Sequence, residues 1–152
     1  MRRDEFERQL DEMQNTSPFR YKLCTQADKC SFANQCLRAI AFANHRDDEF
    51  QEVVNPACQH ITENGCEYFR PDKTCTYGYG FRQFYSTLDR EQRYQFREAF
   101  SSATSRTQFY EMRAGNRLIT PGHIEKVTKA AQAVGITLPD DWLDISYQVR
   151  DW

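Results

Sequence analysis

The sequence predicts a mainly α-helical protein: one small helical domain with a short β-hairpin and an irregular central segment that carries cysteines. Apolar residues recur at helical spacing in several windows, and capping residues precede them. Turn residues crowd the central segment 58–80. At 152 residues the chain can bury one core, and its eleven Phe, eight Tyr and two Trp supply the large side chains for it. We divide this domain into a Cys-bearing half, residues 1–75, and an aromatic and Arg-rich half, residues 76–152.

Three helices are expected in the first half, at residues 4–14, 32–44 and 47–54. In the first of them, apolar residues recur every three or four positions. Ser31 caps the second helix, and Asn55-Pro56 ends the third. The segment Cys24–Cys30 and the segment 58–80 are expected to be irregular.

The second half is expected to contain two helices, at residues 88–103 and 121–134. Ser86 or Thr87 caps the first, and Thr120 followed by Pro121 begins the second. Residues 107–113 and 117–120, joined through Ala114-Gly115-Asn116, are expected to pair as the hairpin. A short helix or an extended tail closes the chain over residues 139–152.

The N-terminus turns acidic at once and has no apolar stretch behind it, unlike a secretory signal. No window is long and apolar enough to span a bilayer, and the net charge of −2 predicts no general attraction to acidic membranes. We therefore expect a cytoplasmic protein with no membrane partner. In a reducing cytosol, cysteines rarely pair as disulfides, so the six here are metal ligands, a catalytic thiol or buried packing residues.

The cysteine spacing favours a metal centre. The six are Cys24, Cys30, Cys36, Cys58, Cys66 and Cys75, and the first three follow a C-x5-C-x5-C pattern. Six helical steps place two side chains about 240° apart, so Cys30 and Cys36 cannot share a helix face. Cys30 must lie before the second helix, with Cys36 pointing back from within it. With a fourth thiolate from Cys66, or alternatively from Cys58 or Cys75, the set suits zinc or a [4Fe–4S] cluster.

Two other interpretations of the cysteines remain open. The first is that they are small buried hydrophobic residues, as unpaired cysteines often are. The second is a thiol enzyme that uses Cys58 beside His60. Against catalysis, His45, His60 and His123 fall in no recognisable nucleophile motif.

The string Cys30-Ser-Phe-Ala-Asn-Gln-Cys36-Leu37-Arg38-Ala39 resembles the second half of the cluster-binding motif of WhiB-like iron–sulfur regulators. In that motif a C-x5-C-L segment leads into a helix. The preceding C-x2-C step of that family is C-x5-C here, and its Gly-Trp turn is absent. What carries over is the geometry of the ligand pair Cys30 and Cys36.

Over most of its length the chain is similar to a family of uncharacterised proteins from anaerobic gut bacteria that share a domain of unknown function. The matching segments are Cys24…Cys30…Cys36-Leu37-Arg38, Asn55-Pro56, Cys66-Glu67-Tyr68-Phe69-Arg70, Tyr77–Phe81, Phe109–Arg113, Leu118–Pro121 and Tyr147…Trp152. The resemblance implies no activity. It implies that Cys24, Cys30, Cys36 and Cys66 belong together, and that Cys58 and Cys75 are additions in this member.

The segment 76–117 combines seven Arg with ten of the nineteen Phe and Tyr residues. Arginine and exposed rings contact phosphates and stack on bases, and a hairpin followed by the helix at 121–134 would imitate a wing and a helix. The same rings are also needed for the core, and the chain as a whole is not basic.

Together these patterns favour a regulatory or adaptor module without catalytic activity, in which Cys24, Cys30, Cys36 and Cys66 hold the metal and a surface contacts a protein or nucleic-acid partner. One alternative is a [4Fe–4S] redox protein or the cluster-bearing component of an enzyme. The other is a nucleic-acid-binding protein that uses the segment 76–117.

Overall fold

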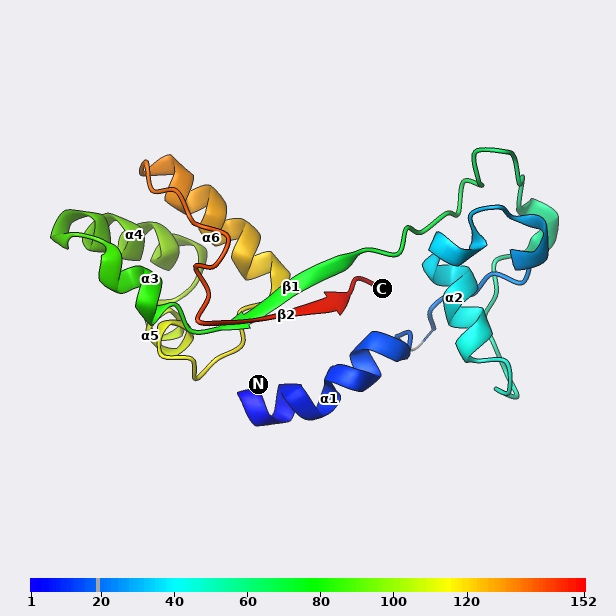
Figure 1. Ribbon diagram of the computed structural model, residues 1–152, viewed down its shortest axis with the longest axis horizontal. Helices are drawn as coiled ribbons and strands as arrows, with labels where there is room; N and C mark the ends of the chain where they lie inside the picture. The colour runs from blue at the N-terminus through cyan, green and yellow to red at the C-terminus, as the bar shows by residue number, and fades with distance from the viewer. Residues whose placement is uncertain (19) are drawn as a thin grey trace. The chain divides into compact units, whose positions relative to one another are not determined.

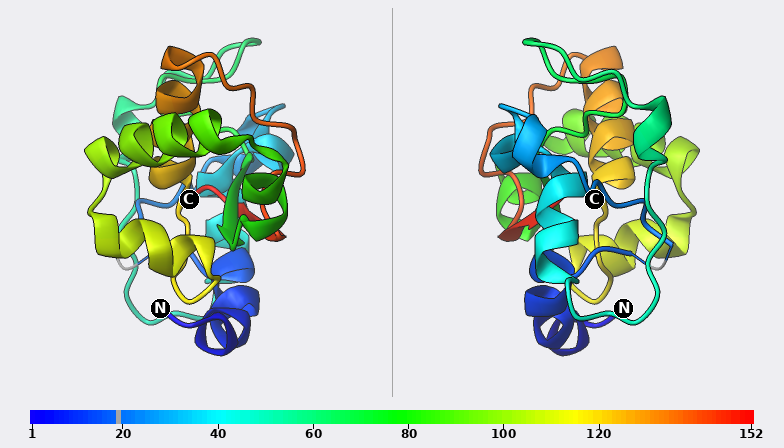
Figure 2. Two further views of the ribbon diagram at one scale, coloured as in Figure 1. Left: turned by 90° about the vertical axis from the view of Figure 1, so that its left-hand side faces the viewer. Right: turned by 90° about the vertical axis from the view of Figure 1, so that its right-hand side faces the viewer.

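The computed structural model describes residues 1–18 and 20–152, and Figures 1 and 2 show its ribbon. Its helices and strands, in chain order, are α1 (Arg3–Asn15), α2 (Leu37–Asn44), β1 (Thr74–Tyr79), α3 (Arg82–Thr87), α4 (Arg90–Ala103), α5 (Arg106–Arg113), α6 (Pro121–Ala133) and β2 (Ile145–Arg150). Three short 3-10 helices lie in the first half: η1 (Ala27–Lys29), η2 (Ala33–Gln35) and η3 (Pro56–Cys58). The predicted mainly α class with one small two-stranded element is confirmed.

The chain divides into two compact units, each assembled from separate segments. Unit 1 comprises Met1–Gln9 and Cys75–Val149, and unit 2 comprises Leu10–Thr74 and Arg150–Trp152. Residues 1–9 belong to the same unit as residues 75–149, and residues 150–152 belong to the same unit as residues 10–74. That the whole chain is a single domain stays a prediction.

In unit 1, β1 and β2 form a two-stranded antiparallel sheet, coloured green and red in Figure 1. The pairing brings Gly78 close to the opposite strand, where an added Cβ would lie 2.9 Å from the carbonyl oxygen of Ile145 and 2.6 Å from Leu143 Cδ1. Phe6 of α1 packs against the sheet, with its ring centroid 5.4 Å from that of Tyr77 and 5.3 Å from that of Tyr147.

The hairpin predicted at 107–120 is wrong, because residues 107–113 form most of α5. A capping box begins that helix: Ser105 Oγ accepts from the backbone N–H of Gln108, and Gln108 Oε1 accepts from that of Ser105. Phe109 and Met112, three positions apart, are both fully buried, which matches the helical period and not that of a strand. The sheet is built instead from two segments that had been expected to be irregular or to form the closing tail.

Unit 1 has a continuous aromatic core. Phe81 lies at its centre, with ring centroids 5.4 to 6.4 Å from those of five other aromatic residues. α4 packs against α6, and these two helices cross in Figure 2. The buried members of the cluster are Phe81, Phe84, Leu88, Phe96, Phe100, Phe109, Met112, Ile119, Val127, Ala131, Ile136 and Trp142.

Helix caps explain which predictions for unit 1 hold. Thr120 caps α6 as expected, and His123 completes the box by accepting from the backbone N–H of Thr120 through Nδ1 (3.2 Å). α4 begins two or three residues later than predicted because Asp89, not Ser86 or Thr87, is its N-cap. The unpredicted helix α3 takes its cap from far along the chain: the Asp144 carboxylate accepts from its first two backbone N–H groups, at 2.8 and 3.1 Å.

Unit 2 is mostly irregular and has a small core. Among the residues of unit 2 that the structure describes, the buried hydrophobic side chains include no aromatic ring; they are Leu23, Cys24, Cys36, Leu37, Ala39, Ala41 and Val54. The helix predicted at 47–54 is wrong, because residues 47–50 form turns and bends and Val53 pairs with Leu23 in an isolated β-bridge. The Leu23 N–H donates to the carbonyl oxygen of Glu52, and the Val54 N–H donates to that of Leu23, both at 2.9 Å.

The last residues of the chain close unit 2. The Arg150 guanidinium forms a two-pronged ion pair with the Asp72 carboxylate, at 2.8 and 3.1 Å. Trp152 donates its indole N–H to the carbonyl oxygen of Met13 at 2.8 Å, and its ring lies edge-on to Tyr21. These contacts tie the C-terminus to α1 and to the segment that precedes β1.

Candidate metal centre

Each of the four predicted ligands lies where the backbone changes direction. Cys24 follows the extended pairing of Leu23, and Cys30 ends η1. Cys36 ends η2 and is the N-cap of α2. The expectation that Cys36 points back from within a helix capped by Ser31 is wrong, because α2 begins at the next residue. The N-cap position leaves its thiol beside the positive end of α2, as the metal hypothesis requires.

Cys66 is placed by a tight turn of the backbone. The N–H of Thr62 donates to the carbonyl oxygen of Gly65 at 2.8 Å, and the reverse bond is 3.1 Å. Gly65 has a φ of +94°, which side chains with a Cβ rarely adopt, so glycine suits this corner. The chain therefore reverses immediately before Cys66.

A single arginine from α2 holds the two cysteine-bearing loops together. Arg38 Nη1 donates to the carbonyl oxygen of Lys22 at 2.7 Å, and its Nε donates to that of Tyr68 at 3.0 Å. Each acceptor lies two residues from a predicted ligand, Cys24 or Cys66. The Cys24 N–H also donates to the Arg38 carbonyl oxygen at 3.0 Å, so the backbone and the side chain of Arg38 position the same loop.

The four thiols lie close enough to affect one another. Burial raises the pKa of the Cys66 thiol, while a hydrogen bond from the Tyr68 backbone lowers it. Charge repulsion from Cys24, Cys30 and Cys36 raises this pKa further. Cys24 and Cys36 also pack together in one buried cluster with Ala39. The structure thus brings the four predicted residues into one region of unit 2.

As they stand, these thiols do not form a finished metal site. Across residues 1–18 and 20–152, no group of three or more His, Cys, Asp or Glu side chains is arranged to hold a metal ion. Cys24, Cys30, Cys36, Cys58 and Cys66 are free thiols in this structure. Whether the four act as ligands stays a prediction.

One side chain at this site was not anticipated from the sequence. Gln59 Nε2 donates to Cys24 Sγ at 3.4 Å, and the Gln59 Oε1 atom is buried without a hydrogen-bond partner among the described residues. Hydrogen bonds of this kind orient the ligands in metal sites of proteins. No sequence signal marks Gln59, because its role depends on the path of an irregular loop.

The other two cysteines differ from these four. Cys58 ends η3 and is exposed, as is His60. Cys75 lies on β1 of unit 1, where its thiol points to the carbonyl oxygen of Val149 at 3.5 Å. The main electrostatic contributions to the raised pKa of Cys66 come from Cys24, Cys30 and Cys36.

The Arg and aromatic segment serves both the core and the surface. Most of its Phe rings are buried, as the core interpretation requires, and α5 replaces the strand that would have formed a wing. On the surface, Arg97 lies over the Tyr94 ring at 5.4 Å, and Arg113 lies over that of Tyr110 at 5.2 Å. Hydrogen bonds from Arg106 and Arg97 lower the pKa of Tyr110. This Arg–Tyr surface is the part of the segment left to contact a partner.

A model of a protein family of unknown function, DUF6078, matches residues 6–148. The chain belongs to the DUF6078 family. The matched range covers most of both units of the chain and contains the positions of all six cysteines. Comparison with curated proteins found no match, and comparison with solved structures found none either. Among the described residues, no helix is long and apolar enough to cross a lipid bilayer.

Proposed function

We propose that unit 2 is a metal-binding module in which Cys24, Cys30, Cys36 and Cys66 hold zinc or a [4Fe–4S] cluster. The module has a regulatory or adaptor role and contacts a macromolecular partner. The observation that supports the proposal is geometric: Cys24 and Cys36 share one buried cluster, and Arg38 joins the loop of Cys24 to the loop of Cys66 through its hydrogen bonds. Four thiols that converge from separate loops are the donor set that both zinc and iron–sulfur clusters use.

The weak core of unit 2 supports the same proposal. Units of about its size are only marginally stable on their core alone, and many natural ones add disulfides or a metal. The buried residues of unit 2 are small or aliphatic, and its cysteines are not used in disulfides. Metal binding would supply the missing stability, because the free energy of binding adds to that of folding.

The loops that carry the ligands allow the thiols to close around a metal. Cys30 and Cys66 are only half-buried, so rotation of their side chains meets few packed neighbours. Because Cys66 has a raised pKa, it is protonated at neutral pH and must lose its proton to bind a metal. Metal affinity is therefore expected to rise with pH.

Metal analysis of the full chain tests the proposal. The protein is purified under air and under anaerobic conditions, and zinc, iron and acid-labile sulfide are measured per chain. We expect either one zinc, or iron and sulfide in the equal amounts of a [4Fe–4S] cluster with a brown colour. Cys66→Ser should lose most of the metal, whereas the matched variant Cys58→Ser should keep it. Folded protein without metal in both preparations would disprove the proposal.

A second candidate function is binding of single-stranded nucleic acid by the Arg–Tyr surface of unit 1. Tyr94 is 56% exposed and Tyr110 36%, and each lies beside an arginine. Anisotropy of labelled single-stranded RNA and DNA tests it. Tyr94→Ala and Tyr110→Ala should each weaken binding by about 1–3 kcal/mol, the usual contribution of one stacked base. Tyr68→Ala removes an exposed ring of unit 2 and is the control. Equal binding by all three variants would rule the function out.

A further inference from the structure

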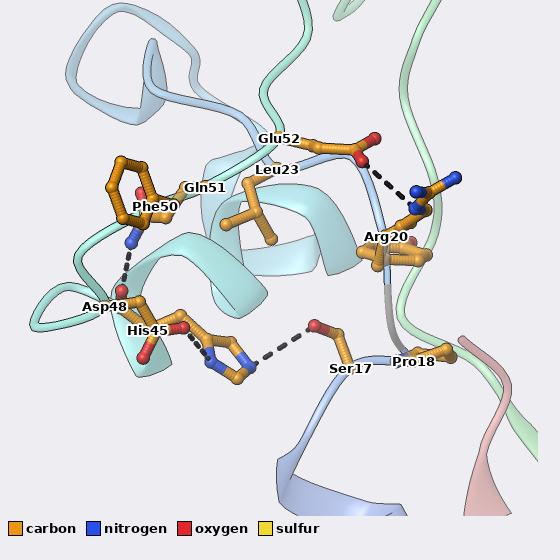
Figure 3. Close-up of a pocket in the computed structure, with 10 residues that line it drawn as sticks. Ser17, Pro18, Arg20, Leu23, His45, Asp48, Phe50, Gln51 and Glu52 are labelled. Atoms are coloured by element: carbon orange, nitrogen blue, oxygen red, sulfur yellow. Dashed lines mark hydrogen bonds and ion pairs between the residues drawn. The ribbon is translucent and has the colours of Figure 1, made fainter.

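A chain of three polar side chains lines a pocket of unit 2 (Figure 3). Ser17 Oγ lies 3.3 Å from His45 Nε2, and His45 Nδ1 lies 3.0 Å from Asp48 Oδ2. The imidazole thus uses one nitrogen for a hydroxyl and the other for a carboxylate. This is the order of groups in a serine nucleophile, its general base and the residue that orients the base.

Local structure holds the three groups in place. His45 is the C-cap of α2, and its backbone N–H donates to the carbonyl oxygens of Ala41 and Phe42. The Asp48 N–H donates to the His45 carbonyl oxygen at 3.2 Å, which fixes the turn that carries the carboxylate. Asn44 Nδ2 donates to the Asn15 carbonyl oxygen at 3.1 Å, so the end of α2 is tied to the end of α1, just before Ser17.

The pocket beside these groups has a volume of about 510 Å³, within the range of sites for small molecules. Pro18, Leu23 and Phe50 form apolar parts of its wall. Phe50 is 86% exposed, an unusual exposure for so large an apolar side chain. In Figure 3 the Ser17 hydroxyl points toward the His45 ring at one side of this pocket.

We propose that Ser17, His45 and Asp48 form a hydrolytic site for carboxylic esters with an apolar acyl group. Asp48 accepts from His45 Nδ1–H and so keeps the imidazole in the tautomer whose Nε2 accepts a proton. A separation of 3.3 Å is long for a working hydrogen bond, but such bonds often shorten only when substrate is bound. The backbone N–H of Ser17 has no partner among the described residues and can donate to the oxyanion.

The reaction needs only water as a second reactant. Ser17 Oγ attacks the ester carbonyl carbon, and its proton passes to His45 Nε2. The ester C–O bond breaks, the leaving alcohol takes that proton, and the acyl group stays on Ser17. Water then gives a proton to His45 Nε2 as its oxygen attacks the acyl carbon. The carboxylic acid leaves as Ser17 recovers its proton.

Active-site labelling tests this proposal with the full chain. A fluorophosphonate probe reacts with activated serines, and mass spectrometry of peptides locates the label. p-Nitrophenyl butyrate measures turnover. We expect the label on Ser17 and turnover that is lost in Ser17→Ala. Ser102 is a serine of unit 1 whose hydroxyl donates to the Ala99 carbonyl oxygen, so Ser102→Ala is the control and should retain both signals.

Variants of the base separate catalysis from a purely structural role. His45→Gln should lower the labelling rate at Ser17 by about 100-fold or more, the usual contribution of a general base. Asp48→Asn should have a smaller effect, because the Asp48 side chain is 55% exposed and water partly replaces it. If folded protein takes no label on Ser17, or if Ser17→Ala retains turnover, the proposal is wrong. Equal labelling rates in the wild type and in folded His45→Gln would show that these hydrogen bonds only connect α1 with α2.

Discussion

Replacement of Cys36 by Ser is expected to destabilise unit 2 and to leave unit 1 intact. Cys36 is 6% exposed, and it is both a proposed ligand and part of the small buried cluster of unit 2. Serine keeps the size of the side chain but does not provide a thiolate. Unit 1 has its own aromatic core, so it does not depend on the metal for its stability.

Two contributions add in this variant. A bound ligand present at about 1,000 times its dissociation constant stabilises the folded state by about 4 kcal/mol, and this stabilisation is lost with the site. A buried hydroxyl without a partner costs a further 1–3 kcal/mol or so. In a unit of this size each kcal/mol shifts the midpoint of thermal unfolding by roughly 4–8 °C. Loss of the metal alone should therefore lower the midpoint of thermal unfolding of unit 2 by roughly 15–30 °C.

The two tryptophans make the assay specific for each unit. Trp142 lies in the core of unit 1, and Trp152 belongs to unit 2. In a Trp142→Phe background, Trp152 fluorescence follows the unfolding of unit 2 alone. Cys58→Ser, which changes an exposed thiol, is the matched control and should unfold like the parent protein. The reasoning is refuted if Cys36→Ser unfolds within about 1 kcal/mol of Cys58→Ser, or if a strong chelator leaves the Trp152 transition unchanged.

Three further predictions concern unit 1. Phe81→Ala should lower the free energy of unfolding of unit 1 in urea by about 3–5 kcal/mol, because removal of a fully buried ring leaves a cavity. The control Tyr94→Ala, at a ring that is 56% exposed, should lower it by less than about 1 kcal/mol. Burial lowers the pKa of His123, with a smaller effect from neighbouring cations, so the neutral form is favoured in the folded state. The contribution of neutral His123 to the free energy of unfolding is therefore present above the ordinary histidine pKa and is lost as the pH falls through the lower pKa of the folded state. His123→Gln keeps the acceptor of the capping box but does not titrate. In urea unfolding between roughly pH 7 and pH 5, this variant should lose less stability than the wild type. Asp144→Ala removes the acceptor for the first two amides of α3 and should cost about 1–2 kcal/mol, whereas Asp144→Asn should cost less; equal losses would show that the cap is not the cause.

Sequence patterns predict the fold well where the signal is local. The helix from Pro121 is correct because its cap, its Pro and its apolar stripe all lie within the helix itself. The strands β1 and β2 were missed because each is stabilised by a partner about 70 positions away in the sequence, which no local window contains. The same reason explains α3, whose cap Asp144 lies beyond α6.

The two candidate sites differ in how clearly the sequence marks them. The grouping of Cys24, Cys30, Cys36 and Cys66 as metal ligands can be proposed from their spacing and from the family resemblance, because cysteine itself marks the chemistry, and it stays a prediction. The arrangement of Ser17 with His45 was not predicted, since both residue types are common and 28 positions separate them. A Ser–His–Asp set is recognised by geometry and not by order in the chain.

Because the chain passes between the two units three times, the order in which it leaves the ribosome matters. Most of unit 2 emerges before any of the aromatic core of unit 1, so the proposed metal site would form while the rest is still being made. The last three residues complete this early-made part: Arg150 reaches Asp72, and Trp152 reaches Met13. Without residues 150–152, unit 1 would keep its core, whereas unit 2 would lack the contacts that Arg150 and Trp152 make.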